Sequence, residues 1–426
     1  MIPITAAGAP GTAGASGGQG WLAVGGLHHL NGTAPAGAAA PIVLAPLARP
    51  MHDTWPSNTV QLDWRDLGPI ELRARSTDGR RRAAGQTTGE RLFDRLLPGP
   101  ELTAVAAAVT AGREVTRPWA TPLVPLFYLA ARPAGTALEV HVYSQIRFLA
   151  EDACFIRLTP EPVRVPDVEG LGWLPEAVER HRADFLFLNN HQRYYRKCFP
   201  GRELEYKYTI DPPTADIWTL TARLCQRLAD RQLAGYLPEY HDEFQAWDYT
   251  NYLFQVTGPE ADRGYVSFIP TTDGANLVKR KWFARDGFDR RETHTYGVLA
   301  ERGFDAYVGE ELGVRAVRLP PFRRARYDVN FESVRTGHVY GIFFDTVSLL
   351  DAPEVQLQQC ELEYLRSRTV VEPDPGAVLA EIEEIAQWLE GFLRECALPA
   401  DRGYYSKLSF LLDAVAGRPE LAVTGG

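Results

Sequence analysis

The sequence lacks several features that would assign it to a well-defined class. It has no apolar run approaching the roughly 18–20 residues needed to span a bilayer, and its N-terminus has no charged segment followed by an apolar stretch. We therefore expect neither a membrane span nor a secretory signal. Its five cysteines are far apart and form no Cys-x-x-Cys pair. This spacing indicates reduced thiols in a cytoplasmic protein, with no disulfide framework and no zinc site.

An excess of positive charge is also missing. The chain has 45 basic and 54 acidic residues and a formal net charge of −9, so we expect no general attraction to nucleic acid or to an anionic membrane. Any anion-binding site must come from local clusters of Lys and Arg. The content of 45% hydrophobic residues is typical of a globular protein with sizeable cores, and 426 residues favour two or three domains.

Composition divides the chain into four segments. Residues 1–20 are almost entirely Gly, Ala, Ser, Pro and Thr, which predicts a flexible tail. Residues 21–195 give mixed, mainly β signals and no chemical motif, which predicts an N-terminal accessory domain. Residues 196–415 predict a second domain, and residues 416–426 a short tail. Within the accessory domain we expect strands at 59–64, 71–75, 137–143 and 154–158 and helices at 101–111 and 174–189.

The second half of the chain predicts many antiparallel strands and few helices. The expected strands are 203–210, 247–256, 265–269, 276–283, 290–297, 316–319, 323–331, 339–347 and 355–368. The expected helices are 215–233, 298–312 and 375–396, the last opened by Asp374-Pro375 as N-cap and first helical residue. This order favours an α+β protein whose C-terminal domain is an antiparallel β-barrel with flanking helices.

The clearest chemical motif is Glu203-Leu204-Glu205-Tyr206-Lys207. On a strand, Glu203, Glu205 and Lys207 project from one face about 6.5 Å apart in succession. Carboxylate oxygens suit Mg²⁺ or Mn²⁺, and the neighbouring ammonium can hold a phosphate oxygen. For these five residues alone, a solvated strand face with a row of ion pairs is the alternative.

Two later strands repeat this spacing with basic residues. Lys279 and Lys281 alternate on one expected strand, and Arg324 and Arg326 alternate on another. If the four cations point into one cavity, their repulsion is tolerable only with bound anions or with the Glu residues close by.

A second acidic set follows. Glu361 and Glu363 are again two residues apart, and Asp345 precedes them on the strand before. Paired acids on two strands and paired bases on two others would together suit a polyanion bound with divalent cations, the usual arrangement for phosphoryl transfer.

The ordered set resembles the CYTH, or triphosphate tunnel metalloenzyme, superfamily over residues 200–412, about half of the chain. Its features are Glu-x-Glu-x-Lys, basic pairs on middle strands, Asp before a second Glu-x-Glu, and a late Ser-Lys. The resemblance implies a closed antiparallel tunnel and cleavage of a small-molecule triphosphate with Mg²⁺ or Mn²⁺. The implied metal ligands are Glu203, Glu205, Asp345, Glu361 and Glu363. The implied triphosphate-binding residues are Lys207, Lys279, Lys281, Arg324 and Arg326. The implied catalytic residues are Glu205, Lys207, Glu361 and Lys407, of which Lys407 would close the tunnel.

One departure from the family keeps alternatives open. The expected strand 265–269 carries no basic residue, where family members usually have a phosphate-binding Arg. Hydrolysis of an inorganic, nucleoside or organic triphosphate is the main expectation. Nucleotide cyclisation, as in class IV adenylate cyclases, and phosphate or nucleotide binding without turnover are the alternatives. We expect no nucleic-acid or membrane partner, and the sequence does not indicate an oligomeric state.

Overall fold

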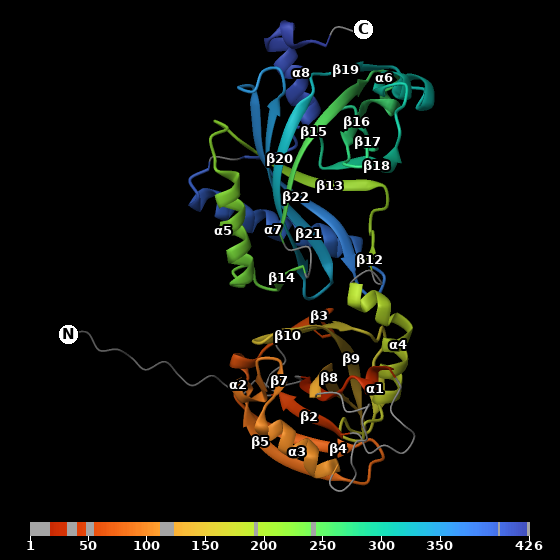
Figure 1. Ribbon diagram of the computed structural model, residues 1–426, viewed down its shortest axis with the longest axis vertical. Helices are drawn as coiled ribbons and strands as arrows, with labels where there is room; N and C mark the ends of the chain where they lie inside the picture. The colour runs from red at the N-terminus through yellow and green to blue at the C-terminus, as the bar shows by residue number, and fades with distance from the viewer. Residues whose placement is uncertain are drawn as a thin grey trace, which may run out of the picture. The chain divides into compact units, whose positions relative to one another are not determined.

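The computed structural model describes residues 18–31, 41–47, 55–110, 123–190, 195–239, 244–398 and 401–423. The chain divides into two compact units, Met1–Arg193 and Tyr194–Gly426, each with its own core (Figure 1). Within the described ranges, no helix combines the length and the apolar character that crossing a membrane requires.

The N-terminal unit is built on an antiparallel sheet with strand order β3-β10-β9-β8-β1-β2-β4-β5, and β11 pairs with β9. The strands of the unit are β1 (Gln19–Gly26), β2 (Pro41–Leu47), β3 (Thr59–Asp63), β4 (Pro69–Ser76), β5 (Arg82–Thr88), β6 (Phe93–Asp94), β7 (Leu97–Pro98), β8 (Leu123–Ala134), β9 (Ala137–Phe148), β10 (Asp152–Arg157) and β11 (Val163–Val165). Its helices are α1 (His28–Asn31), η1 (Trp64–Asp66), α2 (Gly89–Leu92), α3 (Pro100–Thr110) and α4 (Leu174–Asn190). The four strands and two helices expected from the sequence are confirmed, and the other strands of the unit, β1, β2, β5, β6, β7, β8 and β11, come in addition.

The C-terminal unit contains a closed barrel of eight antiparallel strands, which confirms the expected fold class. The strands follow the order β22-β21-β20-β15-β16-β17-β18-β13, and pairing of β13 with β22 closes the ring. The barrel strands are β13 (Arg202–Ile210), β15 (Gln245–Val256), β16 (Gly264–Pro270), β17 (Asn276–Trp282), β18 (Asp289–Val298), β20 (Phe322–Ser333), β21 (His338–Leu349) and β22 (Gln356–Arg368). Short strands outside the ring are β12 (Tyr195–Arg196), β14 (Tyr236–Pro238), β19 (Ala316–Arg318) and β23 (Arg402–Gly403).

Helices cover one outer face of this barrel (Figure 1). Amphipathic helices α5 (Ile217–Ala229) and α7 (Pro375–Glu395) bury Leu224, Ile385 and Leu389 against strand residues such as Leu204 and Leu362. Helix α8 (Lys407–Gly417) packs on a separate cluster at the other end of the barrel. The remaining short helices are η2 (Glu260–Asp262), α6 (Phe304–Ala306), η3 (Tyr307–Glu311) and η4 (Pro419–Leu421). Since the helices cover only outward-facing side chains, the alternate residues of the same strands face the barrel interior.

Three local expectations differ from the structure. The continuous helix expected over 298–312 is wrong, because β18 continues to Val298 and only short helical turns follow Gly303, whose φ of 90° suits glycine. Strand β1 begins inside the expected tail 1–20, and the rest of that segment up to residue 17 lies outside the described residues. At the other end, α8 and η4 extend into the expected tail 416–426.

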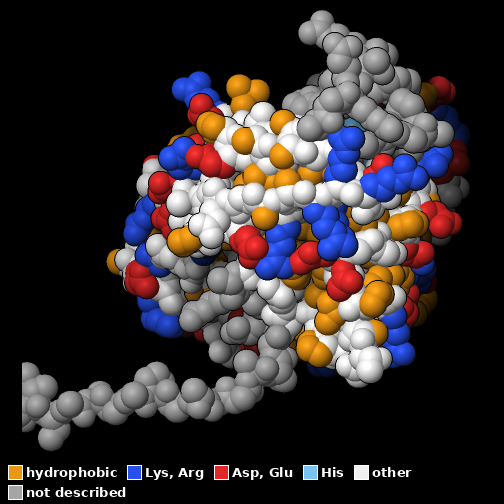
Figure 2. All heavy atoms as spheres, turned by 90° about the horizontal axis from the view of Figure 1, so that it is seen from below, with side chains coloured by type: hydrophobic (Ala, Val, Ile, Leu, Met, Phe, Trp, Pro, Cys, Tyr) orange, Lys and Arg blue, Asp and Glu red, His pale blue; other side chains and the backbone are white. Residues whose placement is uncertain are grey.

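Charged side chains are mixed on the face of the molecule drawn in Figure 2. Among the coloured side chains there, Lys and Arg lie beside Asp and Glu instead of gathering into a patch of one sign. A concentrated set of charged side chains lies inside the barrel.

Candidate active site

A cavity occupies the barrel interior. Side chains from every barrel strand except β21, and from the start of α8, line it. Residues two apart on a strand point into the cavity together, as Glu203, Glu205 and Lys207 of β13 do. Alternation therefore places the predicted residues inside, because their strand neighbours Leu204 and Tyr208 face the core under the helices.

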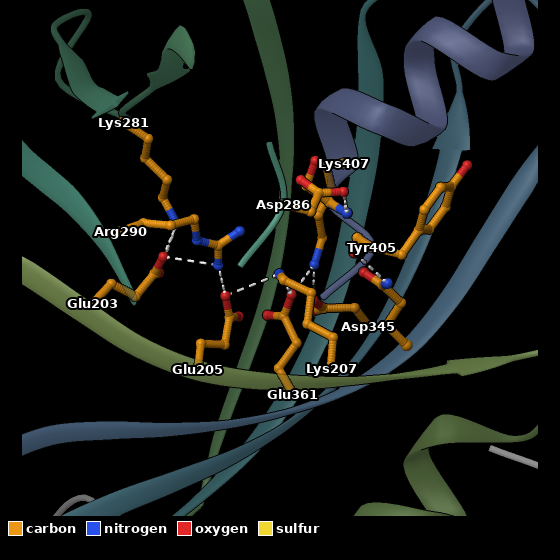
Figure 3. A network of polar contacts seen from close by, with 12 residues as sticks. Glu203, Glu205, Lys207, Lys281, Asp286, Arg290, Asp345, Glu361, Tyr405 and Lys407 are labelled. Atoms are coloured by element: carbon orange, nitrogen blue, oxygen red, sulfur yellow. Dashed lines mark hydrogen bonds and ion pairs between the residues drawn. The ribbon is translucent and has the colours of Figure 1, made fainter. Parts of the chain in front are cut away.

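The charged side chains form a continuous row of opposite charges across the cavity (Figure 3). Lys281 Nζ lies 2.6 Å from each oxygen of Glu203. Arg290 Nη2 lies 3.0 Å from Glu203 Oε2 and also contacts Glu205. Lys207 Nζ continues the row, 3.0 Å from Glu205 and 2.5 Å from Glu361. Every member of this row is buried.

A second cluster gathers around Asp345 and Glu361. Arg326 Nε donates to Asp345 Oδ1 at 2.7 Å, Arg324 lies 2.9 Å from Glu361, and Lys407 Nζ lies 2.9 Å from Asp345. Arg324 also contacts Asp345, and both Arg326 and Lys407 contact Glu361. The carboxylates thus neutralise Lys281, Arg324 and Arg326, three of the four cations that the sequence predicts to repel one another.

The start of α8 holds Lys407 in this cluster. Ser406 caps the helix by accepting a hydrogen bond from the backbone N–H of Ser409 at 3.1 Å. Gln359 Nε2 donates to the carbonyl oxygen of Tyr405 at 2.9 Å. These two contacts fix the backbone next to Lys407, whose ammonium then enters the barrel from its end.

Two further charged residues line the cavity on β17 and β18. Lys279 lines the cavity but makes no hydrogen bond or ion pair with the described residues. Glu292 Oε1 lies 3.0 Å from His294 Nε2 and 3.4 Å from Lys281 Nζ. Lys279 is therefore a cation that an incoming anion can contact without breaking an existing pair.

The electrostatic environment gives the carboxyl groups of the cavity different pKa values. Burial disfavours the charged form of Glu361, but Lys207 and Lys407 outweigh it and hold the pKa of Glu361 well below its usual value. Asp345 has its pKa lowered despite burial, by Arg324 and Arg326. In contrast, removal from bulk water and the charges of Glu203 and Glu205 raise the pKa of Glu363 to about 8. The positive charge near Glu363 is therefore too small to offset burial and the neighbouring carboxylates.

Three of these carboxylates fit a divalent cation. Glu203, Glu205 and Glu363 each offer an oxygen, and the three oxygens lie within 4.8 Å of one another. Such a set of hard oxygen donors suits Mg²⁺ or Mn²⁺. A cation there would also favour the ionised form of Glu363, which burial and the neighbouring carboxylates disfavour.

The structure gathers every residue that the sequence suggests for the site, but in two groups. Glu203, Glu205 and Glu363 converge as possible cation ligands, whereas Asp345 and Glu361 bind Arg324, Arg326 and Lys407. The remaining basic residues, Lys207, Lys279 and Lys281, line the same cavity.

Sequence reasoning missed Arg290 and Glu292. Both lie on β18 and point into the cavity together with His294. The feature that could have identified them is the spacing of two residues between the charged side chains in Arg290-Arg291-Glu292-Thr293-His294. The same spacing identified the other strands. Arg290 supplies a cation to the cavity, whereas β16 contributes only Tyr265, Ser267 and Ile269.

Comparisons with known proteins add little to this geometry. No protein-family model matches the chain, and no curated protein matches it. Among solved structures, a putative adenylyl cyclase, HpAC1 from Hippeastrum, described as having a dominant triphosphatase activity, has a TM-score of 0.31 at 15% identity and covers 50% of this chain and 96% of its own. The Pct1 RNA triphosphatase of S. pombe, in complex with the Spt5 CTD, has a TM-score of 0.20 at 12% identity and covers 51% and 85%. Likeness at this level carries no conclusion about function.

Proposed function

We propose that the C-terminal unit cleaves a phosphoanhydride bond of a small-molecule triphosphate with the help of Mg²⁺ or Mn²⁺. One observation carries the proposal: a closed barrel holds three converging carboxylates and seven Lys and Arg side chains around one cavity. Phosphoryl transfer relies on positioning and on neutralising the charge of the phosphate oxygens, and the cavity offers both.

The proposed role of each residue follows from its position in the cavity. Glu203, Glu205 and Glu363 would hold the cation, which supplies positive charge against the phosphate oxygens. Lys279, which has no ion-pair partner among the described residues, would bind phosphate first. Arg324 and Arg326 share Asp345 and Glu361, and their guanidinium groups border the cavity where the polyphosphate would extend.

The neutralised interior also favours a particular form of substrate. Six of the seven cations already have carboxylate partners, so a bare triphosphate would add uncompensated negative charge. A triphosphate that carries its divalent cations adds almost none. We therefore expect the metal complex of the triphosphate to be the substrate.

The test is a phosphate-release screen of the full chain. Tripolyphosphate, the four nucleoside triphosphates and thiamine triphosphate would each be supplied with Mg²⁺ and with Mn²⁺, and products from labelled ATP would be separated. Orthophosphate release supports the proposal. Cyclic AMP with pyrophosphate would establish cyclisation instead, and tight binding without any product would establish a binding protein.

A further inference from the structure

Arg290 lies at the position that a cation would need. Its side chain is 2% exposed, and the single nitrogen Nη2 contacts both Glu203 and Glu205, two of the three converging carboxylates. A divalent cation cannot contact the same two carboxylates while a guanidinium lies between them, because the two positive charges would repel in a buried site. The cation site of the protein is therefore filled by one of its own side chains.

The guanidinium is poorly satisfied in this position. Arginine has five N–H donors in a planar fork that matches two oxygens of a carboxylate or phosphate. Here one nitrogen serves two carboxylates, and Nε is buried without a hydrogen-bond acceptor among the described residues. A buried donor without an acceptor costs free energy, so a phosphate group offering two oxygens would be a better partner than the present pair.

The other partners of the two carboxylates allow this exchange. Glu203 keeps Lys281 at 2.6 Å and Glu205 keeps Lys207 at 3.0 Å when Arg290 leaves. Arg290 packs over the ring of Phe283, 5.6 Å from the ring centroid, and its neighbours Glu292 and His294 on β18 also line the cavity. A change of side-chain rotamer, without movement of the strand, can therefore turn the guanidinium toward a ligand in the cavity.

We propose that Arg290 is an internal competitor of the divalent cation, held between Glu203 and Glu205 until an oxyanion in the cavity attracts it away. This inference rests on the proposed function, since it concerns the same cation and polyphosphate. Its consequence follows from thermodynamic linkage: the anion that removes Arg290 from the carboxylates tightens cation binding, and the cation tightens anion binding by the same factor.

The test measures Mn²⁺ binding to the full chain without any substrate. Free Mn²⁺ is followed by its electron paramagnetic resonance signal during titration of the wild type, of Arg290→Gln and of Arg291→Gln. We expect Arg290→Gln to bind Mn²⁺ at least about tenfold more tightly than the wild type, because the competing charge is gone. Arg291→Gln is the matched control, because Arg291 is the adjacent residue on the exposed face of β18 and loses the same charge.

A second titration uses the wild type alone. Mn²⁺ binding is measured in sulfate and in chloride at equal ionic strength, since sulfate is a tetrahedral oxyanion. We expect sulfate to tighten Mn²⁺ binding by about fivefold or more, within the usual range of coupling between sites. In Arg290→Gln this effect of sulfate should disappear. If Arg290→Gln does not fold, the wild-type comparison decides, and equal binding in both salts overturns the proposal.

The outcomes separate this inference from the proposed function. Equal Mn²⁺ affinity in the wild type, Arg290→Gln and Arg291→Gln would show that Arg290 is a fixed counter-ion, even if triphosphate cleavage is found. Tighter Mn²⁺ binding in Arg290→Gln alone would support the proposal that Arg290 competes with the cation, even if no triphosphate is cleaved.

Discussion

Two lysines on the same face of β17 should give opposite results when each is replaced by alanine. Lys279 and Lys281 both line the cavity, two residues apart. Lys281 is buried and lies 2.6 Å from Glu203, whereas Lys279 has no ion-pair partner among the described residues. We expect Lys281→Ala to reduce stability and Lys279→Ala to reduce substrate binding.

The structure sets the size of each effect. Removing one partner of a buried ion pair costs about 3–5 kcal/mol, and Lys281→Ala should lie near the lower end because Arg290 still contacts Glu203. Lys279→Ala leaves no carboxylate unpaired, so its free energy of unfolding should change by less than about 0.5 kcal/mol. A charge-assisted hydrogen bond to phosphate contributes about 1.5–3 kcal/mol, so the KM for tripolyphosphate should rise about tenfold to a hundredfold.

Urea denaturation measures the first effect and steady-state kinetics the second. Arg280→Ala is not a suitable control, because its guanidinium donates to the backbone carbonyl oxygen of Tyr265 at 3.1 Å. Arg291→Gln, on an exposed strand face, should leave the KM unchanged and cost at most about 1 kcal/mol of stability, the size of its cation–π contact with Trp282. Equal destabilisation by Lys279→Ala and Lys281→Ala would refute the reasoning, because it would mean that Lys279 is also part of the paired network.

Three further predictions follow from single features. Glu205→Gln should abolish turnover with Mg²⁺ or Mn²⁺ while circular dichroism shows an intact fold; an unchanged rate at saturating Mg²⁺ would contradict a role in cation binding. A fragment beginning near Asn190 contains every barrel strand and should fold and retain some triphosphate cleavage; a folded but inert fragment would mean that the N-terminal unit contributes to the site. Burial, reinforced by Arg157, lowers the pKa of His141 from 6.5 to about 4, so the unfolded chain takes up a proton first and stability should fall as pH falls from about 6.5 towards 4. The melting temperature of His141→Gln should depend less on pH over this range, and identical slopes would contradict that cause.

Strand periodicity explains why so much of the barrel could be predicted. β13, β17 and β20 each have one face toward the charged cavity, so charged residues recur there at every second position, as at Glu203 and Glu205, Lys279 and Lys281, and Arg324 and Arg326. This alternation identifies both the strand and the face that a residue occupies. The inward-facing positions of Glu203, Lys279 and Arg324 could therefore be predicted from the amino-acid sequence alone.

The same rule fails at β1 of the N-terminal unit for a physical reason. β1 is buried along seven of its eight residues, because the sheet is covered on both faces there, and its sequence shows no alternation. Its glycines add to the resemblance to a flexible tail. Yet a Cβ at Gly20 would lie 2.6 Å from the hydroxyl oxygen of Tyr128, so glycine is required there by close packing and does not signal disorder.

Strand periodicity cannot predict which residues pair with one another across the barrel. Alternation shows that Glu205 faces inward, but its ion-pair partners come from its own strand and from β18, and only the register of the closed sheet brings Arg290 close. The acids implied as one set of metal ligands therefore separate according to their neighbours. Asp345, on the strand next to β20, and Glu361 both bind the two arginines of β20, whereas Glu363 converges with Glu203 and Glu205. A candidate cation site arises where the pairing of β13 with β22 places Glu205 opposite Glu363, so Glu363 becomes a candidate ligand through the topology of the barrel as much as through its own sequence motif.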